Sequence, residues 1–330
     1  MINIDAEIYR EFTCKADKCK HTCCRGWEID IDDDTLDYYN GLDTELGNEI
    51  RKNISGCGQE DESASFMLTI DERCPFLKDD GLCRIIEELG DDGMCDICRL
   101  HPRFYESIND YNLAGVGLSC EKASELLFGK KSLDFIICDS VDSSCYDSCD
   151  GSESGTGSGD SGGRRIGFTK LLELLEIDYP EEYLDISNVL SDYLSESRIE
   201  KILDVFYNTE PIDDNWKKEV SLLKESYKDY LCHLSGKDEE SAKKDIAIRD
   251  ITIRDIDIKR YEVIYRYIIF RQLDQIEVYG MKKLYEYAAS SIIYIMLYAA
   301  AIHDDIEAVR RWSEQIEYDD DNINYIIKNL

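Results

Sequence analysis

The cysteines of this chain are concentrated in one part of the sequence. Thirteen of the 14 lie within the first 150 residues, and only Cys232 follows. Core packing alone would spread thiols along the chain, because a free cysteine behaves as a small apolar side chain. Most of the cysteines fall into two close groups and one separate position: Cys14, Cys19, Cys23 and Cys24; Cys74, Cys83, Cys95 and Cys98; and Cys120. The N-terminal half is therefore predicted to be built around something that thiolates bind.

The spacing of these cysteines limits what they can bind. Zinc ribbons and fingers use two pairs of ligands, at least one of them two cysteines separated by two residues (Cys-x2-Cys). This chain has one Cys-x2-Cys pair, Cys95 and Cys98. Iron–sulfur clusters accept irregular spacing and ligands from distant segments, so the spacing favours them over zinc, and redox-active thiols remain a third alternative. The Cys-x3-Cys-x2-Cys pattern of radical enzymes begins at Cys19 and Cys23 but fails at Gly26.

Charge and hydropathy exclude some classes of partner. A net charge of −33 repels the phosphate backbone, so nucleic acid is a poor partner, and basic partners are favoured, although such a charge also serves solubility alone. The longest apolar stretch, residues 288–302, is too short to span a bilayer and predicts a buried helix, with no membrane partner. Residues 1–7 lack the features of a secretory signal, so we expect reduced thiols and a cytoplasmic location.

Composition divides the chain into three segments and predicts a mainly α protein. Residues 1–138 form a cysteine-rich module with short strands, residues 139–165 a flexible Gly/Ser/Asp linker or loop, and residues 166–330 an α-helical bundle on which the module packs. Strands are predicted at residues 28–32, 66–70 and 112–116. Helices are predicted at residues 35–53, 83–89, 121–128, 170–175, 181–194, 198–207, 216–234, 256–273, 281–302, 306–316 and 322–330.

Four motifs in residues 12–128 resemble a known family. The first runs from Phe12 to Ile29 and contains Cys23-Cys24-Arg25-Gly26-Trp27. The others are Cys74-Pro75-Phe76-Leu77 with Gly81-Leu82-Cys83-Arg84-Ile85, then Cys98-Arg99-Leu100-His101-Pro102-Arg103-Phe104, then Leu118-Ser119-Cys120-Glu121. In content and order they resemble the flagellin lysine-N-methylase (FliB-type) family, and more distantly the cysteine-rich zinc- or iron-chelating proteins. The C-terminal helices resemble the family only loosely.

The resemblance implies an activity and a metal centre. It implies methyl transfer from S-adenosylmethionine to lysine ε-amines of flagellin before export, and a four-iron four-sulfur cluster. The resemblance implies eight candidate cysteine ligands, which is more than the four that one cluster takes. Some of the eight are therefore structural, or there are two metals. Cys57 and Cys95 match no motif position. The ligand candidates that the resemblance implies are Cys14, Cys19, Cys23, Cys24, Cys74, Cys83, Cys98 and Cys120. Alternatives are a non-enzymatic zinc- or iron-chelating module and a redox or electron-transfer protein.

Lysine methylation needs further groups beside the thiols. The acceptor amine must be neutral, so a carboxylate or tyrosine must orient or deprotonate it, and Asp30, Asp32 and Glu121 lie beside cysteine motifs. Arg99 and Arg103 flank Cys98 and can bind the carboxylate of S-adenosylmethionine. A tyrosine stripe at Tyr261, Tyr265 and Tyr267 can line a cation–π pocket but is favoured as helix packing. Trp27 and His101 are favoured as structural residues.

Overall fold

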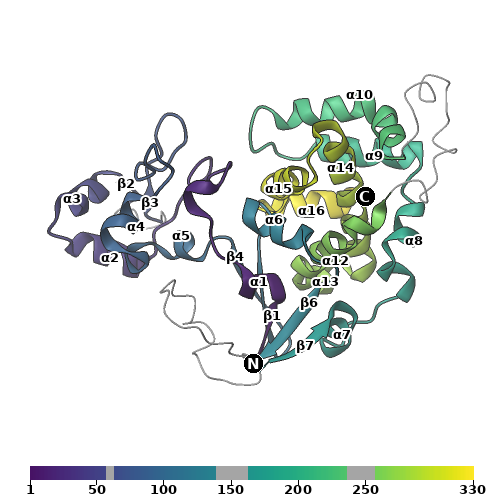
Figure 1. The fold of residues 1–330 in the computed structure, drawn as a ribbon, viewed down its shortest axis with the longest axis horizontal. Coiled ribbons are helices and arrows are strands. Elements are labelled where there is room, and N and C mark those ends of the chain that lie inside the picture. Colours follow the sequence, from purple (N-terminus) through teal and green to yellow (C-terminus); the bar gives the residue numbers. More distant parts are fainter. Residues whose placement is uncertain (57–62, 139–162, 236–256) are drawn as a thin grey trace. The chain divides into compact units, whose positions relative to one another are not determined.

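The computed structural model describes residues 1–56, 63–138, 163–235 and 257–330. Most of the expected linker at 139–165 lies outside the described residues, as do Cys57, Cys145 and Cys149, whereas residues 163–165 belong to a strand. The chain forms two compact units. Figure 1 shows the fold with colours that run from the N-terminus to the C-terminus. We call residues 13–104 and 120–122 the cysteine unit, and residues 1–12, 105–119 and 123–330 the helical unit.

The cysteine unit consists of short elements joined by loops. Its strands β2 and β3 pair antiparallel, with Ile54 opposite Phe66. The predicted strand at 28–32 contributes only an isolated bridge between Asp30 and Ser65. The elements are η1 (Ala16–Lys18), α2 (Asp33–Gly41), α3 (Glu45–Lys52), β2 (Ile54–Ser55), β3 (Ser65–Phe66), α4 (Arg84–Leu89), η2 (Asp91–Gly93) and α5 (Asp96–Leu100).

One predicted helix of this unit is divided in two. The stretch 35–53 forms α2 and α3, because Leu42 ends α2 in an extended conformation and Thr44 begins α3. The Thr44 hydroxyl accepts a hydrogen bond from the Gly47 N–H at 3.0 Å, as an N-cap does. Local capping thus overrides the apolar periodicity that continues across the break.

The helical unit contains a five-stranded mixed sheet with strand order β4-β5-β1-β6-β7. Strand β1 pairs parallel with β5, which confirms the strand predicted at 112–116, and antiparallel with β6. The two units divide the chain differently from the expected segments 1–138 and 166–330, because β1 pairs with residues of β5 and β6, and β6 pairs with β7. The strands are β1 (Ile2–Ala6), β4 (Arg103–Ile108), β5 (Tyr111–Val116), β6 (Asp134–Cys138) and β7 (Gly163–Gly167).

Helices make up most of the helical unit, and 57% of the structure is helical, which confirms the mainly α class. The helices predicted at 216–234 and 281–302 begin and end as expected. The helices are α1 (Glu7–Glu11), α6 (Glu121–Phe128, whose first two residues belong to the cysteine unit), α7 (Phe168–Leu174), η5 (Glu181–Leu184), α8 (Ile186–Ser191), α9 (Glu196–Tyr207), α10 (Trp216–Leu234), η8 (Ile258–Tyr261), α12 (Glu262–Arg271), η9 (Leu273–Gln275), α13 (Ile276–Tyr279), α14 (Met281–Ile302), α15 (Asp305–Ile316) and α16 (Asp320–Asn329).

Helix α14 is the centre of this unit. It contacts α8, α9, α10, α12, α13, α15 and α16 and is buried along most of its length. The apolar stretch expected to be too short for a bilayer belongs to a helix of 22 residues, and within the described residues this helix alone is long and apolar enough to cross a membrane. The expected burial is confirmed, since 78% of its most apolar window is buried inside the unit. A helix that is apolar on nearly all sides is what the core of a large bundle requires.

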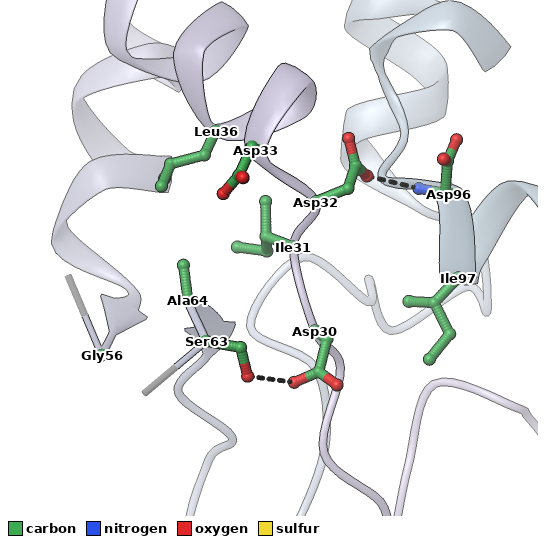
Figure 2. A pocket seen from close by; sticks show the side chains of 10 residues that line it. All are labelled: Asp30, Ile31, Asp32, Asp33, Leu36, Gly56, Ser63, Ala64, Asp96 and Ile97. Carbon is green, nitrogen blue, oxygen red and sulfur yellow. Dashed lines mark hydrogen bonds between the residues drawn. The ribbon is translucent and has the colours of Figure 1, made fainter. Parts of the chain in front are cut away.

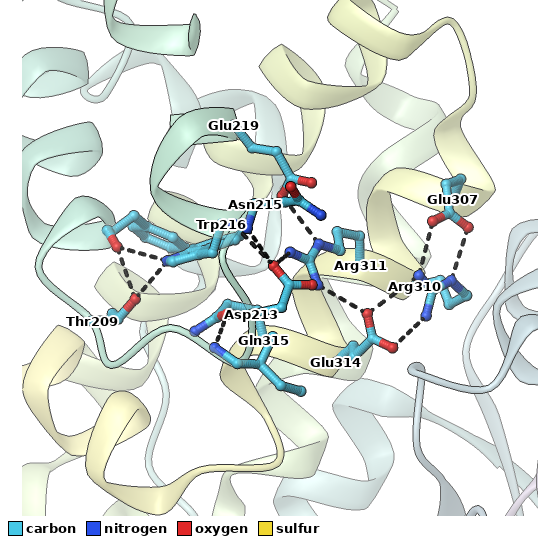
Figure 3. A network of polar contacts seen from close by, with 12 residues as sticks. Thr209, Asp213, Asn215, Trp216, Glu219, Glu307, Arg310, Arg311, Glu314 and Gln315 are labelled. Atoms are coloured by element: carbon cyan, nitrogen blue, oxygen red, sulfur yellow. Dashed lines mark hydrogen bonds and ion pairs between the residues drawn. The ribbon is translucent and has the colours of Figure 1, made fainter. Parts of the chain in front are cut away.

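A polar network joins α10 to α15. Arg311 contacts Asp213 and Glu219, each at about 3 Å, and also pairs with Glu314 on its own helix. Figure 3 shows this guanidinium between the two acidic groups before and within α10. Because the Arg311 side chain is only 7% exposed, the arrangement is a buried, multiply paired charge that fixes the packing of the two helices.

Candidate thiol-rich site

Five cysteines of the cysteine unit belong to one apolar core. Cys74 and Cys95 are buried among Tyr39, Phe66 and Phe76. The half-buried side chains of the other three pack against the same core. We call the five the inner thiols: Cys24, Cys74, Cys83, Cys95 and Cys98. Four of them were predicted ligands, and the structure adds Cys95 to the group. Its Cys-x2-Cys spacing from Cys98 was the feature of the sequence that could have indicated this.

Backbone contacts explain why these thiols meet. The Cys74 N–H donates to the Cys24 carbonyl at 2.9 Å, which joins the first cysteine motif to the second. Leu77 and Cys83 form a bridge, so the chain turns back on itself between Cys74 and Cys83. Cys95 precedes α5, and the Cys98 N–H donates to the Cys95 carbonyl at 3.1 Å. Three distant segments therefore deliver their thiols to one core.

The turn after Cys24 depends on glycine. Gly26 adopts a φ of +83°, a left-handed conformation that other residues adopt at a cost, and its N–H donates to the Glu72 carbonyl. Trp27 then packs against the apolar core of the cysteine unit, and its indole N–H donates to the Cys23 carbonyl at 2.6 Å. The structural role expected for Trp27 is confirmed, since it anchors this turn to the core.

Four further thiols lie outside this core. Glu121 clamps the loop between Cys14 and Cys23: its carboxylate accepts from the Lys15 ammonium at 2.5 Å and from the Lys20 N–H at 2.8 Å. Because Cys120 precedes Glu121, the clamp fixes its backbone beside the loop. We call the four the outer thiols, which are exposed or half-buried: Cys14, Cys19, Cys23 and Cys120.

Burial and neighbouring thiols raise the pKa of a cysteine in each group. Burial, and then negative charge on Cys120 and Cys14, raises the pKa of Cys19 to about 11. Burial, and then negative charge on Cys24 and Cys83, raises the pKa of Cys74 to about 12. A bound cation would favour the thiolate form of such thiols, because it offsets their mutual repulsion.

Neighbouring thiols share protons unequally. The hydrogen bond between Cys95 and Cys98 lowers the pKa of Cys95 and raises that of Cys98. The bond between Cys23 and Cys24 lowers the pKa of Cys24 to about 7 and raises that of Cys23. One thiol of each pair is therefore the first to become thiolate, which is the form that binds metals.

The donor chemistry of the unit suits a thiolate-bound metal. All eight predicted ligands lie in the cysteine unit, and thiolates select zinc and iron–sulfur clusters. Within the part of the chain that the structure describes, no three Cys, His, Asp or Glu side chains are already arranged to hold a metal ion. The type of donor therefore fits a metal, whereas the arrangement of the side chains does not by itself define one.

An acidic cavity of about 650 Å³ lies in the same unit. Asp30, Asp32, Asp33 and Asp96 line it together with apolar residues, as Figure 2 shows. Asp32 accepts hydrogen bonds from the Thr35 and Asp96 N–H groups, which outweigh burial and lower its pKa. It therefore caps α2, whereas the Asp30 carboxylate accepts a hydrogen bond from the Ser63 hydroxyl at 3.3 Å.

The other predicted groups fall in different surroundings. The Glu121 carboxylate forms an ion pair with Lys15, so it is not available as a base. Arg99 pairs with Asp96 on the exposed face of α5, and Arg103 begins β4. The tyrosine stripe Tyr261, Tyr265 and Tyr267 is buried in the helical unit, which confirms its role in packing. Burial lowers the pKa of His101 to about 4, so it is neutral near pH 7.

Comparisons with known proteins identify relatives over part of the chain. No protein-family model and no solved structure matches. A stretch of 121 residues, 34% of the chain, is 26% identical to the lysine-N-methylases of Salmonella typhimurium and Salmonella choleraesuis. It covers 29% of each methylase, and the flagellar biosynthetic protein FliU of Salmonella muenchen matches at the same identity over 69% of its length. The chain is thus similar, over about a third of its length, to proteins named lysine-N-methylase.

Proposed function

We propose that this chain is a protein-lysine N-methyltransferase that transfers methyl groups from S-adenosylmethionine to flagellin in the cytoplasm, before export. The observation that carries the proposal is the 121-residue similarity to lysine-N-methylases. The name of the third relative, a flagellar biosynthetic protein, supports flagellin as the substrate. The four cysteine motifs of residues 12–128, which resemble the same family, also support it.

The proposal includes a four-iron four-sulfur cluster held by cysteines of the thiol-rich unit. The donor set supports it, since nine described thiols from residues 14–120 lie in this unit. When bound, iron would join segments that are distant in sequence, so metal binding would contribute to folding. Cys24→Ala and Cys98→Ala are each expected to lose metal and stability, and Cys232→Ala, in the helical unit, is the matched control.

The acidic cavity is compatible in chemistry with a lysine side chain. Its apolar walls, Ile31, Leu36 and Ile97, suit the methylene stem, and Asp30 and Asp33 suit the ammonium group. The amine must lose its proton before it attacks the sulfonium methyl group, and the methyl then leaves sulfur as the new carbon–nitrogen bond forms. The rate is therefore expected to rise with pH as more lysine becomes neutral.

Arg99 is proposed to bind the carboxylate of S-adenosylmethionine, together with Arg103. The half-exposed guanidinium of Arg99 is held only by the neighbouring Asp96 in the described structure, so a ligand carboxylate can replace that partner. Calorimetry should show weaker binding of S-adenosylmethionine to Arg99→Ala. Arg84→Ala is the control, since Arg84 pairs with Glu49 and Glu88 in the same unit.

The direct test is a transfer assay. The full chain, purified without oxygen, is incubated with flagellin of its own organism and S-adenosylmethionine carrying a labelled methyl group. Label on flagellin lysines is expected, and it should disappear when the metal is removed. A metal-replete protein that neither binds S-adenosylmethionine nor labels flagellin would refute the enzyme and leave a metal-binding module.

A further inference from the structure

We propose that strand β4, at the edge of the sheet in the helical unit, docks an extended, lysine-bearing segment of the protein substrate. The segment would pair with residues 105–108 and add a further strand to the sheet. It would flank the lysine that is methylated, so this surface recognises the substrate and takes no part in the chemistry. The inference rests on the proposed function, because that function supplies a protein substrate.

Strand β4 is an edge strand without the usual protection. It lies at one end of the sheet order β4-β5-β1-β6-β7, and an edge strand presents backbone N–H and C=O groups to which another chain can pair. Proteins commonly protect such edges with basic side chains or proline. At the other end, β7 carries the exposed Arg164 and Arg165, whereas residues 105–108 contain neither a basic residue nor proline. The β4 edge is therefore the one open to strand addition.

A cavity of about 380 Å³ follows this edge. Tyr105, Glu106, Ser107 and Asn112 line it. Successive side chains of a strand point to opposite faces of a sheet, so a cavity lined by three consecutive residues of β4 lies along the edge and not on one face. Exposure agrees, because Tyr105 and Ser107 are exposed and Glu106 is half-buried. The volume is near the lower end of ligand cavities, about 300–1,000 Å³, and suits one long side chain of a docked segment.

Side-chain contacts hold the docking strand in place before any ligand binds. The Ser107 hydroxyl donates to the Asn112 side-chain oxygen at 3.0 Å, and the Asn112 amide donates to the Asn3 side-chain oxygen at 3.1 Å. These contacts run across β4, β5 and β1. The Tyr105 and Tyr9 hydroxyls share a hydrogen bond at 3.0 Å, and their rings meet edge to face. A strand held in this way loses little conformational freedom on binding, which favours affinity.

The charges around Glu106 favour a basic occupant. Burial, and then the negative charge of Asp274, raises the pKa of Glu106, and Asp320 adds to this effect while Arg271 opposes it. Arg271 also pairs with Glu317, at 3.4 Å, so its charge is shared. A lysine ammonium group beside Glu106 would relieve the repulsion between these carboxylates. A second copy of this chain, with a net charge of −33, would increase it, so the charges select a lysine-bearing segment over a dimer through β4.

Binding of a peptide to the full chain tests the proposal. The probe is a short peptide of alternating lysine and threonine, and calorimetry measures its affinity. Glu106→Gln, which preserves the shape of the side chain, should weaken binding about tenfold or more. Glu277→Gln, an exposed glutamate on α13 of the same unit, is the control and should bind like wild type. A peptide with norleucine in place of lysine should bind the wild type and Glu106→Gln equally weakly.

Hydrogen exchange shows whether the peptide adds as a strand. Amides of residues 105–108 should exchange more slowly in the complex, because strand addition gives edge amides a new acceptor. A peptide with every backbone nitrogen methylated should not bind. Exchange that the peptide leaves unchanged at these residues, equal affinity of Glu106→Gln and wild type, or no binding at all would overturn the docking surface. Protection of the same amides by self-association, as the protein concentration rises, would overturn the choice of occupant.

Kinetics separate docking from chemistry. In the transfer assay, Glu106→Gln should raise the KM for flagellin about tenfold and leave kcat unchanged. Methyl transfer with the same KM in wild type and Glu106→Gln would overturn this inference and leave the proposed enzyme standing. Peptide binding along β4 in a protein that transfers no methyl group would refute the enzyme and leave a docking surface for basic segments.

Discussion

Replacing Glu121 tests whether one carboxylate holds the outer loop in place. In the structure the Glu121 side chain is 8% exposed and accepts from the Lys15 ammonium at 2.5 Å. It also accepts from two backbone N–H groups, those of Lys20 at 2.8 Å and His21 at 3.3 Å. Glu121→Ala removes all three acceptor contacts, including the ion pair with the Lys15 ammonium, whose side chain is 17% exposed.

The expected cost is large for a single side chain. A hydrogen bond to a charged group contributes about 1.5–3 kcal/mol, and breaking a buried ion pair costs about 3–5 kcal/mol. Since these contacts share one carboxylate, we expect Glu121→Ala to lower the free energy of unfolding of the cysteine unit by about 3–5 kcal/mol. Glu121→Gln keeps an acceptor oxygen but loses the charge, so we expect it to lower the free energy of unfolding by about 2 kcal/mol.

The pH dependence of this contact has a defined sign. Lys15 and the two N–H groups outweigh burial and lower the pKa of Glu121 in the folded state. The contribution to stability is therefore fully present above the unfolded pKa, about 4.3, and is lost as the pH falls through the folded value. The Gln variant should lack this part of the acid sensitivity.

Hydrogen exchange at residues 15–23 and chemical denaturation measure the effect. The Lys20 and His21 amides should exchange at least about tenfold faster in Glu121→Ala. Glu87→Gln is the control, because its ion pair with Lys78 is solvent-exposed and contributes little to stability. Unchanged exchange at these amides together with an unchanged denaturation midpoint would refute the clamp.

Three further predictions concern single residues. Burial lowers the pKa of His101 to about 4, so the free energy of unfolding should decrease by about 3 kcal/mol as the pH falls from 6.5 to about 4. Denaturation of His101→Gln at several pH values should lack this decrease. Arg311→Ala should cost about 3–5 kcal/mol in thermal unfolding, whereas Arg99→Ala should stay within about 0.5 kcal/mol. Tyr267→Phe removes a hydroxyl that contacts both the N–H and the carbonyl of Val116, so a loss of about 2–4 kcal/mol is expected; a variant as stable as wild type would contradict the contact.

Periodic apolar patterns predicted the long helices because those patterns act locally. Residues 216–234 and 281–302 form helices with the expected bounds, since each presents enough apolar surface to be buried whatever its neighbours are. Short elements were less predictable. The helix expected at 35–53 breaks at Leu42, where capping by Thr44 competes with continuation, and the strand expected at 28–32 forms only a bridge.

The sequence by itself determined that the thiols are concentrated, that Cys14, Cys74 and Cys98 lie in motifs, and that the C-terminal half is helical. Only the tertiary structure decided which thiols share a core. It also placed Cys95 among them, committed Glu121 to Lys15, and joined β1 to β5 and β6 across more than 100 residues. The physical reason is that pairing between strands and packing around buried thiols depend on partners far along the chain, whereas spacing reports only on near neighbours.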